Sequence, residues 1–112
     1  MSAKRQMRVG IVGAGVMAEA MIAGLIADRA VAPGALVASH PRRDRREALA
    51  ERYGIRVVAA NPEAASGTEI VVLAVKPQML GRVMRDLGPA LRPDQVVLSI
   101  VAGATIGALS TG

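Results

Sequence analysis

The stretch of residues 8–25 reads RVGIVGAGVMAEAMIAGL and combines the elements on which the fold prediction depends. Its first five residues are mainly apolar and β-branched, and such a short run predicts a strand. A glycine-rich turn follows, and a segment rich in Ala, Met and Leu then predicts a helix from about Val16 to Arg29. A strand, a glycine turn and a helix in this order form the context that the G-x-G-x-x-G/A dinucleotide-binding fingerprint requires. We therefore expect a nucleotide to bind where this strand ends.

Each small residue of the fingerprint has its own physical role. Gly13 permits a tight turn, Gly15 lets a pyrophosphate approach the backbone, and Ala18 lets the helix lie close to the strand. The first N–H groups of the helix, near Val16 and Met17, have no partner within the helix and lie at the positive end of its dipole. The sequence therefore predicts that backbone donors of this turn bind the pyrophosphate.

Strands and helices alternate along the rest of the chain. This alternation predicts an α/β fold with a doubly wound, mostly parallel sheet, the Rossmann-like arrangement of NAD(P)-binding domains. Right-handed crossovers then bring the turns after strands one, two, four and five to one carboxyl edge. The expected strands are residues 8–12, 35–39, 55–58, 69–75 and 96–101, with a turn at Ala32-Pro33-Gly34, one helix closed by Gly54 and another that begins at Lys76-Pro77.

Two further helix starts are predicted from capping residues. Asn61 precedes Pro62, and Asn is a favoured N-cap when Pro occupies the first helical position. Thr105 is expected to cap a final helix. For Asn61, a contact to the adenine side of a cofactor is the alternative to a purely structural role.

At 112 residues the chain is expected to form one domain. We interpret residues 1–7 as a disordered leader and residues 8–112 as a dinucleotide-binding domain. Residues 9–27 are almost uncharged, but Glu19 and the glycines at 10, 13 and 15 argue against a membrane span. We therefore expect a cytoplasmic protein without a membrane partner.

Composition excludes several kinds of site. The chain has no cysteine and a single histidine, His40, which excludes a thiolate or multi-histidine metal site. Tyr53 is the single aromatic residue, which argues against base-stacking surfaces. The net charge of +5 suits an anionic cofactor, and without a nucleic-acid-binding motif we expect no nucleic-acid partner. No residue is identified as catalytic by its pattern.

The end of the second predicted strand indicates which cofactor binds. An acidic residue there usually bonds the ribose hydroxyls of NAD, whereas the 2′-phosphate of NADP needs cations and hydroxyl donors. Here the strand ends in Ser39-His40-Pro41-Arg42-Arg43, with no acidic residue before Asp44. Because arginine binds phosphate oxygens bidentately, Arg42 and Arg43 favour NADP(H), with NAD(H) as the alternative.

Residues beside these arginines have more open roles. We expect Arg45 and Arg46 to form a solvated helix face. His40 either bonds the same phosphate or has no role. Lys76 follows the apolar fourth strand, where it either holds cofactor or substrate in the ligand crevice or extends into water.

Three motifs give the chain a family resemblance. They are Val12-Gly13-Ala14-Gly15-Val16-Met17-Ala18, Leu73-Ala74-Val75-Lys76-Pro77-Gln78 and Ser99-Ile100-Val101-Ala102-Gly103-Ala104-Thr105-Ile106. In these residues the sequence resembles the N-terminal domain of pyrroline-5-carboxylate reductase, and the resemblance covers essentially the whole chain after the leader. Val101 departs from the alanine that is more usual in that family.

The resemblance implies a reductase that makes proline by hydride transfer from NAD(P)H to the C=N bond of an imino acid, pyrroline-5-carboxylate. Family members continue into a C-terminal helical domain that forms the homo-oligomer and most of the imino-acid pocket, and these 112 residues lack it. We therefore expect this chain alone to be inactive, with apolar surface exposed at Ile100, Ile106 and Leu109. The residue patterns and the resemblance together imply cofactor contacts from Val12, Gly13, Ala14, Gly15, Val16, Met17, Ser39, His40, Arg42, Arg43, Asn61, Ala74, Val75, Lys76, Pro77 and Ala102.

Two other functions stay open at this point. The hydroxyacid dehydrogenases share the glycine turn, so the chain is alternatively the NADP-binding domain of an enzyme of that group. A cofactor-binding module without catalysis is the third interpretation.

Overall fold

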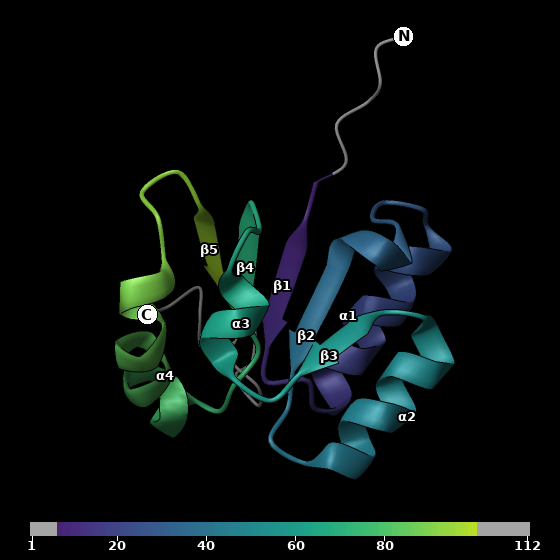
Figure 1. The fold of residues 1–112 in the computed structure, drawn as a ribbon, viewed down its shortest axis with the longest axis horizontal. Helices are drawn as coiled ribbons and strands as arrows, with labels where there is room; N and C mark the ends of the chain where they lie inside the picture. The colour runs from purple at the N-terminus through teal and green to yellow at the C-terminus, as the bar shows by residue number, and fades with distance from the viewer. Residues whose placement is uncertain (1–6, 101–112) are drawn as a thin grey trace, which may run out of the picture.

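The computed structural model describes residues 7–100 of the chain. Within them, five parallel strands form one sheet in the order β3-β2-β1-β4-β5, with helices on both faces (Figure 1). This arrangement confirms the predicted doubly wound α/β fold. The expectations for leader residues 1–6, Val101, Ala102, Thr105, Ile106 and Leu109 lie outside the described residues. The strands are β1 Val9–Val12, β2 Leu36–Ser39, β3 Arg56–Val58, β4 Ile70–Leu73 and β5 Val96–Ser99.

The helices lie close to the predicted places, but the one predicted to begin at Lys76-Pro77 is a 3₁₀ turn over Pro77–Met79, and α4 itself begins at Leu80. Gly54 closes the second helix in the left-handed conformation, as expected. The first helix ends two residues earlier than predicted, because Asp28 caps it and Arg29 turns to a positive φ of 57°. None of the helices within residues 7–100 combines the length and apolar character needed to cross a membrane. The helices are α1 Val16–Ala27, α2 Arg43–Tyr53, α3 Asn61–Ala65 and α4 Leu80–Leu87, with 3₁₀ turns at Pro33–Ala35, Pro77–Met79 and Gly88–Ala90.

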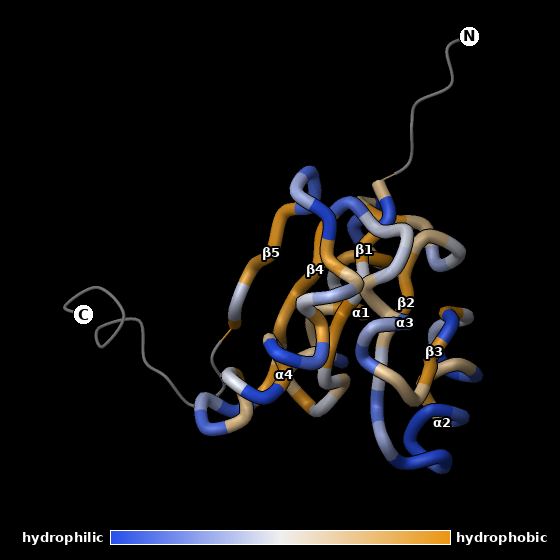
Figure 2. The backbone as a smooth tube through the Cα atoms, turned by 60° about the vertical axis from the view of Figure 1, so that its left-hand side comes forward, coloured by the Kyte–Doolittle hydropathy of each residue, from blue (hydrophilic) through white to orange (hydrophobic). Residues whose placement is uncertain are grey.

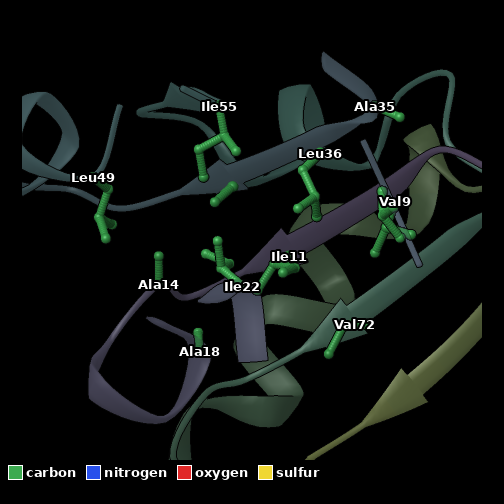
Figure 3. Close-up of a cluster of buried hydrophobic side chains, with 12 residues drawn as sticks. Val9, Ile11, Ala14, Ala18, Ile22, Ala35, Leu36, Leu49, Ile55 and Val72 are labelled. Atoms are coloured by element: carbon green, nitrogen blue, oxygen red, sulfur yellow. The ribbon is translucent and has the colours of Figure 1, made fainter. Parts of the chain in front are cut away.

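Strand side chains alternate between two hydrophobic cores. On one face of the sheet, Ile11 of β1 packs with Ile22 of α1 and Leu49 of α2 (Figure 3). On the other face, Val12 packs in a second cluster with Leu87 of α4. Both faces of the sheet are covered, which suits the mainly apolar residues of the inner strands, as Figure 2 shows for β1 and β4.

The outer strand β5 is the exception to this burial. Val96, Val97 and Leu98 remain 52%, 37% and 49% exposed. Ile100, which we expected to be exposed, is instead partly buried against the α1-side core. Its N–H group donates to the Leu73 carbonyl oxygen at 2.8 Å, and this bond draws the residue onto the sheet. At this end of the sheet, the exposed apolar side chains within the described chain are therefore those of β5 itself.

The predicted N-cap of the third helix is wrong. Ala60 occupies the N-cap position of α3, and Asn61 is the first helical residue. The Asn61 side chain does not cap the helix, because its Oδ1 accepts a hydrogen bond from the Ser39 hydroxyl at 2.8 Å. Local sequence suggested a cap, whereas the neighbouring strand supplies the partner.

Candidate functional site

A cleft opens at the carboxyl edge of the sheet beside β1. Val12, the last residue of β1, is in register with Ser39 of β2 on one side and Leu73 of β4 on the other. The strand order reverses at this point, and ligands of such sheets bind in the crevice outside the strand ends. The cleft has a volume of about 700 Å³ and is lined by Gly13, Gly15, Val16, Met17, Ala18, Ala20, His40, Pro41, Ala74, Val75, Lys76 and Met79.

Many of the predicted site residues meet in this cleft, but several do not line it. Val12, Ala14 and Ser39 are buried beneath it. Arg42, Arg43, Asn61 and Pro77 lie outside its lining. Sequence reasoning did not assign Ala20 or Met79 to the site. Both residues could have been predicted from their nearness to predicted contacts. Ala20 lies in the first turns of α1, and Met79 lies just beyond Lys76-Pro77.

The two glycines of the turn differ in what surrounds them. Gly13 has a φ of +89°, and a Cβ there would lie 2.7 Å from Val75 Cγ1 and 2.9 Å from the Ala74 carbonyl oxygen. Gly15 has extended backbone angles, and a Cβ there would meet nothing within 4 Å. Gly13 is therefore required by the fold, whereas the position of Gly15 leaves open space at the start of α1.

The buried Ser39 hydroxyl braces the glycine turn from the side of β2. Its Oγ accepts a hydrogen bond from the Gly13 N–H at 3.2 Å and donates one to Asn61 Oδ1 at 2.8 Å. The Ser39 carbonyl oxygen accepts another from the Ala14 N–H at 2.8 Å. Both peptide N–H groups that begin the turn are thus fixed by a single residue of the neighbouring strand.

Arg45 and Arg46 do not form the solvated face that we expected. Arg46 Nη1 donates to the carbonyl oxygens of His40 and Pro41, at 3.0 and 2.8 Å. Arg45 Nε donates to the Ala14 carbonyl oxygen at 3.3 Å. Arg46 thus holds the loop just before its own helix, whereas Arg45 reaches an acceptor 31 residues away that the sequence does not show as a neighbour.

Arg42 and Arg43 have the opposite orientation and extend into solvent. Their side chains are 67% and 83% exposed. Each has an acidic partner on the surface, Asp44 for Arg42 at 3.7 Å and Glu47 for Arg43 at 3.0 Å. Exposed pairs of this kind contribute only about 0–1 kcal/mol, so an anion can replace the acidic partner at little cost.

His40 lines the cleft in a defined protonation state. Its Nδ1 accepts a hydrogen bond from the Arg42 N–H at 3.1 Å, so the neutral ring carries its proton on Nε2. Burial lowers the pKa of His40 below its ordinary value of 6.5, and the charges of Arg42 and Arg45 lower it further. At neutral pH the residue is therefore an uncharged donor.

The donor set of the cleft fits a dinucleotide. The first helical N–H groups of α1 lack partners within the helix and adjoin the open space at Gly15, which suits a pyrophosphate. The apolar side chains of Val16 and Met17, 86% and 43% exposed, offer a surface for an uncharged ring. Among residues 7–100, no group of three His, Asp or Glu side chains is placed to hold a metal ion.

Comparison with known proteins identifies the class to which this fold and cleft belong. Residues 8–103 match the family described as NADP oxidoreductase coenzyme F420-dependent, and the chain belongs to this family. Within it, the chain is similar to the pyrroline-5-carboxylate reductase of Synechocystis, with 44% identity over 106 residues. That alignment covers 94% of this chain and 39% of the Synechocystis protein, so the chain spans well under half the length of this relative.

Solved structures show the same similarity. A pyrroline-5-carboxylate reductase from Coxiella burnetii superposes with a TM-score of 0.81 at 26% identity, over 96% of this chain and 40% of that one. The Plasmodium falciparum enzyme, solved with NADP bound, gives a TM-score of 0.74 at 25% identity, over 97% of this chain and 38% of that one. The predicted resemblance to pyrroline-5-carboxylate reductases is thereby confirmed.

Proposed function

We propose that the chain is the NADP(H)-binding domain of a reductase that converts pyrroline-5-carboxylate to proline. The observation that carries the proposal is the open space at Gly15, beside the unpartnered N–H groups that begin α1. The Synechocystis relative supports the reaction, and the Plasmodium falciparum structure supports the cofactor.

In this proposal the glycine turn, the β4 side and the β2 side of the cleft bind different parts of the cofactor. The N–H groups of Val16 and Met17 hold the pyrophosphate, and Val12, Gly13 and Ala14 shape the turn that presents them. When bound, the reduced cofactor supplies a hydride for the imine carbon. We assign the remaining contacts to Ala74, Val75, Lys76, Pro77 and Ala102 on the β4 and β5 side, and to His40 and Asn61 on the β2 side.

We also propose that NADP(H) binds more tightly than NAD(H). Arg42 and Arg43 follow β2 directly, and their guanidinium groups are free to move toward a 2′-phosphate because both are exposed. No acidic residue before Asp44 occupies the place where a ribose hydroxyl acceptor is expected. Hydrogen bonds to charged groups contribute about 1.5–3 kcal/mol each, so one such contact is worth about tenfold or more in affinity.

Calorimetric titration of the 112-residue chain with NADPH and NADH tests this preference. The Arg42→Ala, Arg43→Ala double variant should lose the preference and keep the affinity for NADH. The matched control is Arg82→Ala, Arg85→Ala, which removes the same charge from exposed positions of α4 outside the cleft lining. Equal affinities in the unmodified chain, or a preference that the control also loses, would contradict the proposal.

The same proposal assigns imino-acid binding and homo-oligomer contacts to parts of the enzyme beyond this chain, which corresponds to 39% of the Synechocystis relative. Hydride transfer needs donor and acceptor atoms aligned at about 3–3.5 Å, which requires the imine to be fixed as well as the cofactor. We therefore expect the 112 residues alone to bind NADPH without oxidising it in the presence of pyrroline-5-carboxylate. We also propose a cytoplasmic location, which cell fractionation can test.

The test compares the rate of NADPH oxidation by this chain with the rate by a chain extended by a helical C-terminal domain. Comparable rates for the two would show that the substrate site is misplaced.

A further inference from the structure

We propose that Arg45 is a positioning residue that holds the glycine turn in its cofactor-binding geometry, and that Glu19 keeps it in place. The inference rests on the proposed cofactor function. Arg45 lies on α2, 31 residues from Ala14, yet its Nε donates to the Ala14 carbonyl oxygen at 3.3 Å. Its side chain is 20% exposed, in contrast to 67% for Arg42 on the same segment.

The contact fixes a peptide plane. The Ala14 carbonyl and the Gly15 N–H belong to one planar peptide unit, so an atom that holds the carbonyl also orients the N–H. The Gly15 N–H donates to the Gly13 carbonyl oxygen at 2.8 Å, and the Ala14 N–H to the Ser39 carbonyl oxygen at 2.8 Å. Arg45 therefore supplies the contact that fixes the Ala14 carbonyl, immediately before the helix whose first N–H groups face the pyrophosphate.

Glu19 of α1 contacts three polar side chains of α2, two as hydrogen-bond donors and one as an ion-pair partner. Its Oε2 accepts from Arg52 Nη1 at 2.6 Å and from the Tyr53 hydroxyl at 2.7 Å. Its Oε1 forms an ion pair with Arg45 Nη2 at 2.9 Å, in which the buried Nη2 is not aligned as a hydrogen-bond donor. The hydrogen bonds from Tyr53 and Arg52 and the positive charge of Arg45 lower the pKa of Glu19, so it is charged at neutral pH. The carboxylate thus anchors Arg45 beside the turn.

Arg45 can affect cofactor binding through its positive charge as well as through its contact with the turn. Glu19 lies in the first turn of α1, where its negative charge opposes a bound pyrophosphate. Arg45 and Arg52 both offset that charge, but only Arg45 contacts the turn. Arg52→Gln is therefore a matched control for Arg45→Gln, because each removes one positive charge and one partner of Glu19.

The experiment compares these two variants of the 112-residue chain in two measurements. Calorimetry with NADPH should show about a tenfold loss of affinity for Arg45→Gln, which removes a charge-assisted hydrogen bond to the turn, and less than about threefold for Arg52→Gln, whose exposed ion pair does not contact the turn. NMR of the cofactor-free chain should show altered Gly15 and Val16 amide resonances and faster Gly15 amide exchange in Arg45→Gln alone. Arg45→Lys, which keeps the charge and a donor, should regain part of the affinity and serves if Arg45→Gln fails to fold.

The outcomes distinguish this inference from the proposed function. Equal losses of affinity in Arg45→Gln and Arg52→Gln would show that charge alone acts, which overturns the positioning role. If the unmodified chain does not bind NADPH, the proposed function fails, and the NMR measurement still decides the inference. Unchanged Gly15 and Val16 amides in Arg45→Gln would overturn it in every case.

Discussion

The two sides of the cleft are held in different ways. On the β2 side, Ser39 and Arg45 hydrogen-bond to the glycine turn, and Arg46 holds the following loop. On the β4 side, the loop approaches the turn through the Val75 side chain and through the Ala74 N–H, which donates to the Val12 carbonyl oxygen at 2.9 Å. The β2 side, where backbone N–H groups must be held in place, is fixed by polar side chains. The β4 side instead offers a contact surface. Four substitutions test this difference.

Gly13→Ala should have the largest effect, because Gly13 is where the two sides touch. The added methyl would press on Val75 and on the Ala74 carbonyl oxygen at a φ of +89°. Backbone strain of about 1–3 kcal/mol and overpacking of about 1–3 kcal/mol together predict a loss of roughly 2–6 kcal/mol in the free energy of unfolding, measured in urea. Gly34→Ala is the control, since a Cβ there meets nothing within 4 Å. A loss below about 1 kcal/mol for Gly13→Ala would mean that the two sides separate easily.

Gly15→Val should remove cofactor binding and leave the fold intact. The side chain would project into open space, so the free energy of unfolding should change by less than about 1 kcal/mol. The same side chain would occupy the approach of the pyrophosphate, so calorimetry should detect no binding of NADPH. A folded variant that binds as tightly as the unmodified chain would show that the turn is only structural.

Ser39→Ala tests the polar bracing against a matched position on the other side. Ser39 and Ser99 stand at equivalent places, paired in register with Val12 and Leu73, but Ser39 is buried and Ser99 exposed. Ser39→Ala leaves the Gly13 N–H and Asn61 Oδ1 without a partner, which should cost about 1–3 kcal/mol of stability. Ser99→Ala should change stability by less than about 0.5 kcal/mol, and equal effects of both variants in denaturant titrations would remove the distinction between the two sides.

The smallest effect is a pH dependence from the β2-side loop. Because the pKa of folded His40 lies below 6.5, the unfolded chain binds the proton more readily, so stability is lost as the pH falls through 6.5 toward the folded pKa. In His40→Asn the amide oxygen can still accept the Arg42 N–H without titrating. Between pH 7 and pH 5 the melting temperature should therefore decline less for the variant than for the unmodified chain. Glu19 does not titrate in this range, because its pKa is lowered from 4.5. Identical declines would show that His40 does not contribute.

The parts of this protein that were predictable from the sequence depend on residues near each other in the chain. Gly54 closes α2 because a left-handed residue after a helix favours glycine, and no distant residue alters that preference. The apolar run of β4 is buried on both faces, as its continuous pattern indicates. The glycine turn follows β1 and precedes α1 at the expected residues, so the sequence correctly predicts where the cleft lies.

The remaining features depend on contacts between distant segments. Asn61 bonds Ser39 across 22 residues in place of capping its own helix, and Arg45 reaches Ala14 across 31. Gly10 is needed because a Cβ there would collide with the Ala64 carbonyl oxygen of α3, a neighbour that exists only once the sheet is covered.

The strands, the glycine turn and the doubly wound class of fold were predictable from the sequence, because hydrophobic periodicity and turn chemistry act over a few residues. It was the folded structure that set Arg45 apart from its neighbours, because Arg42, Arg43 and Arg46 have partners nearby in the chain, whereas the partners of Arg45, Ala14 and Glu19, lie on the segment around α1. It also decided that Ile100 is drawn onto the sheet while Val96 and Leu98 of β5 stay exposed. The physical reason is the same throughout: a side chain takes its role from whichever element the strand order brings beside it.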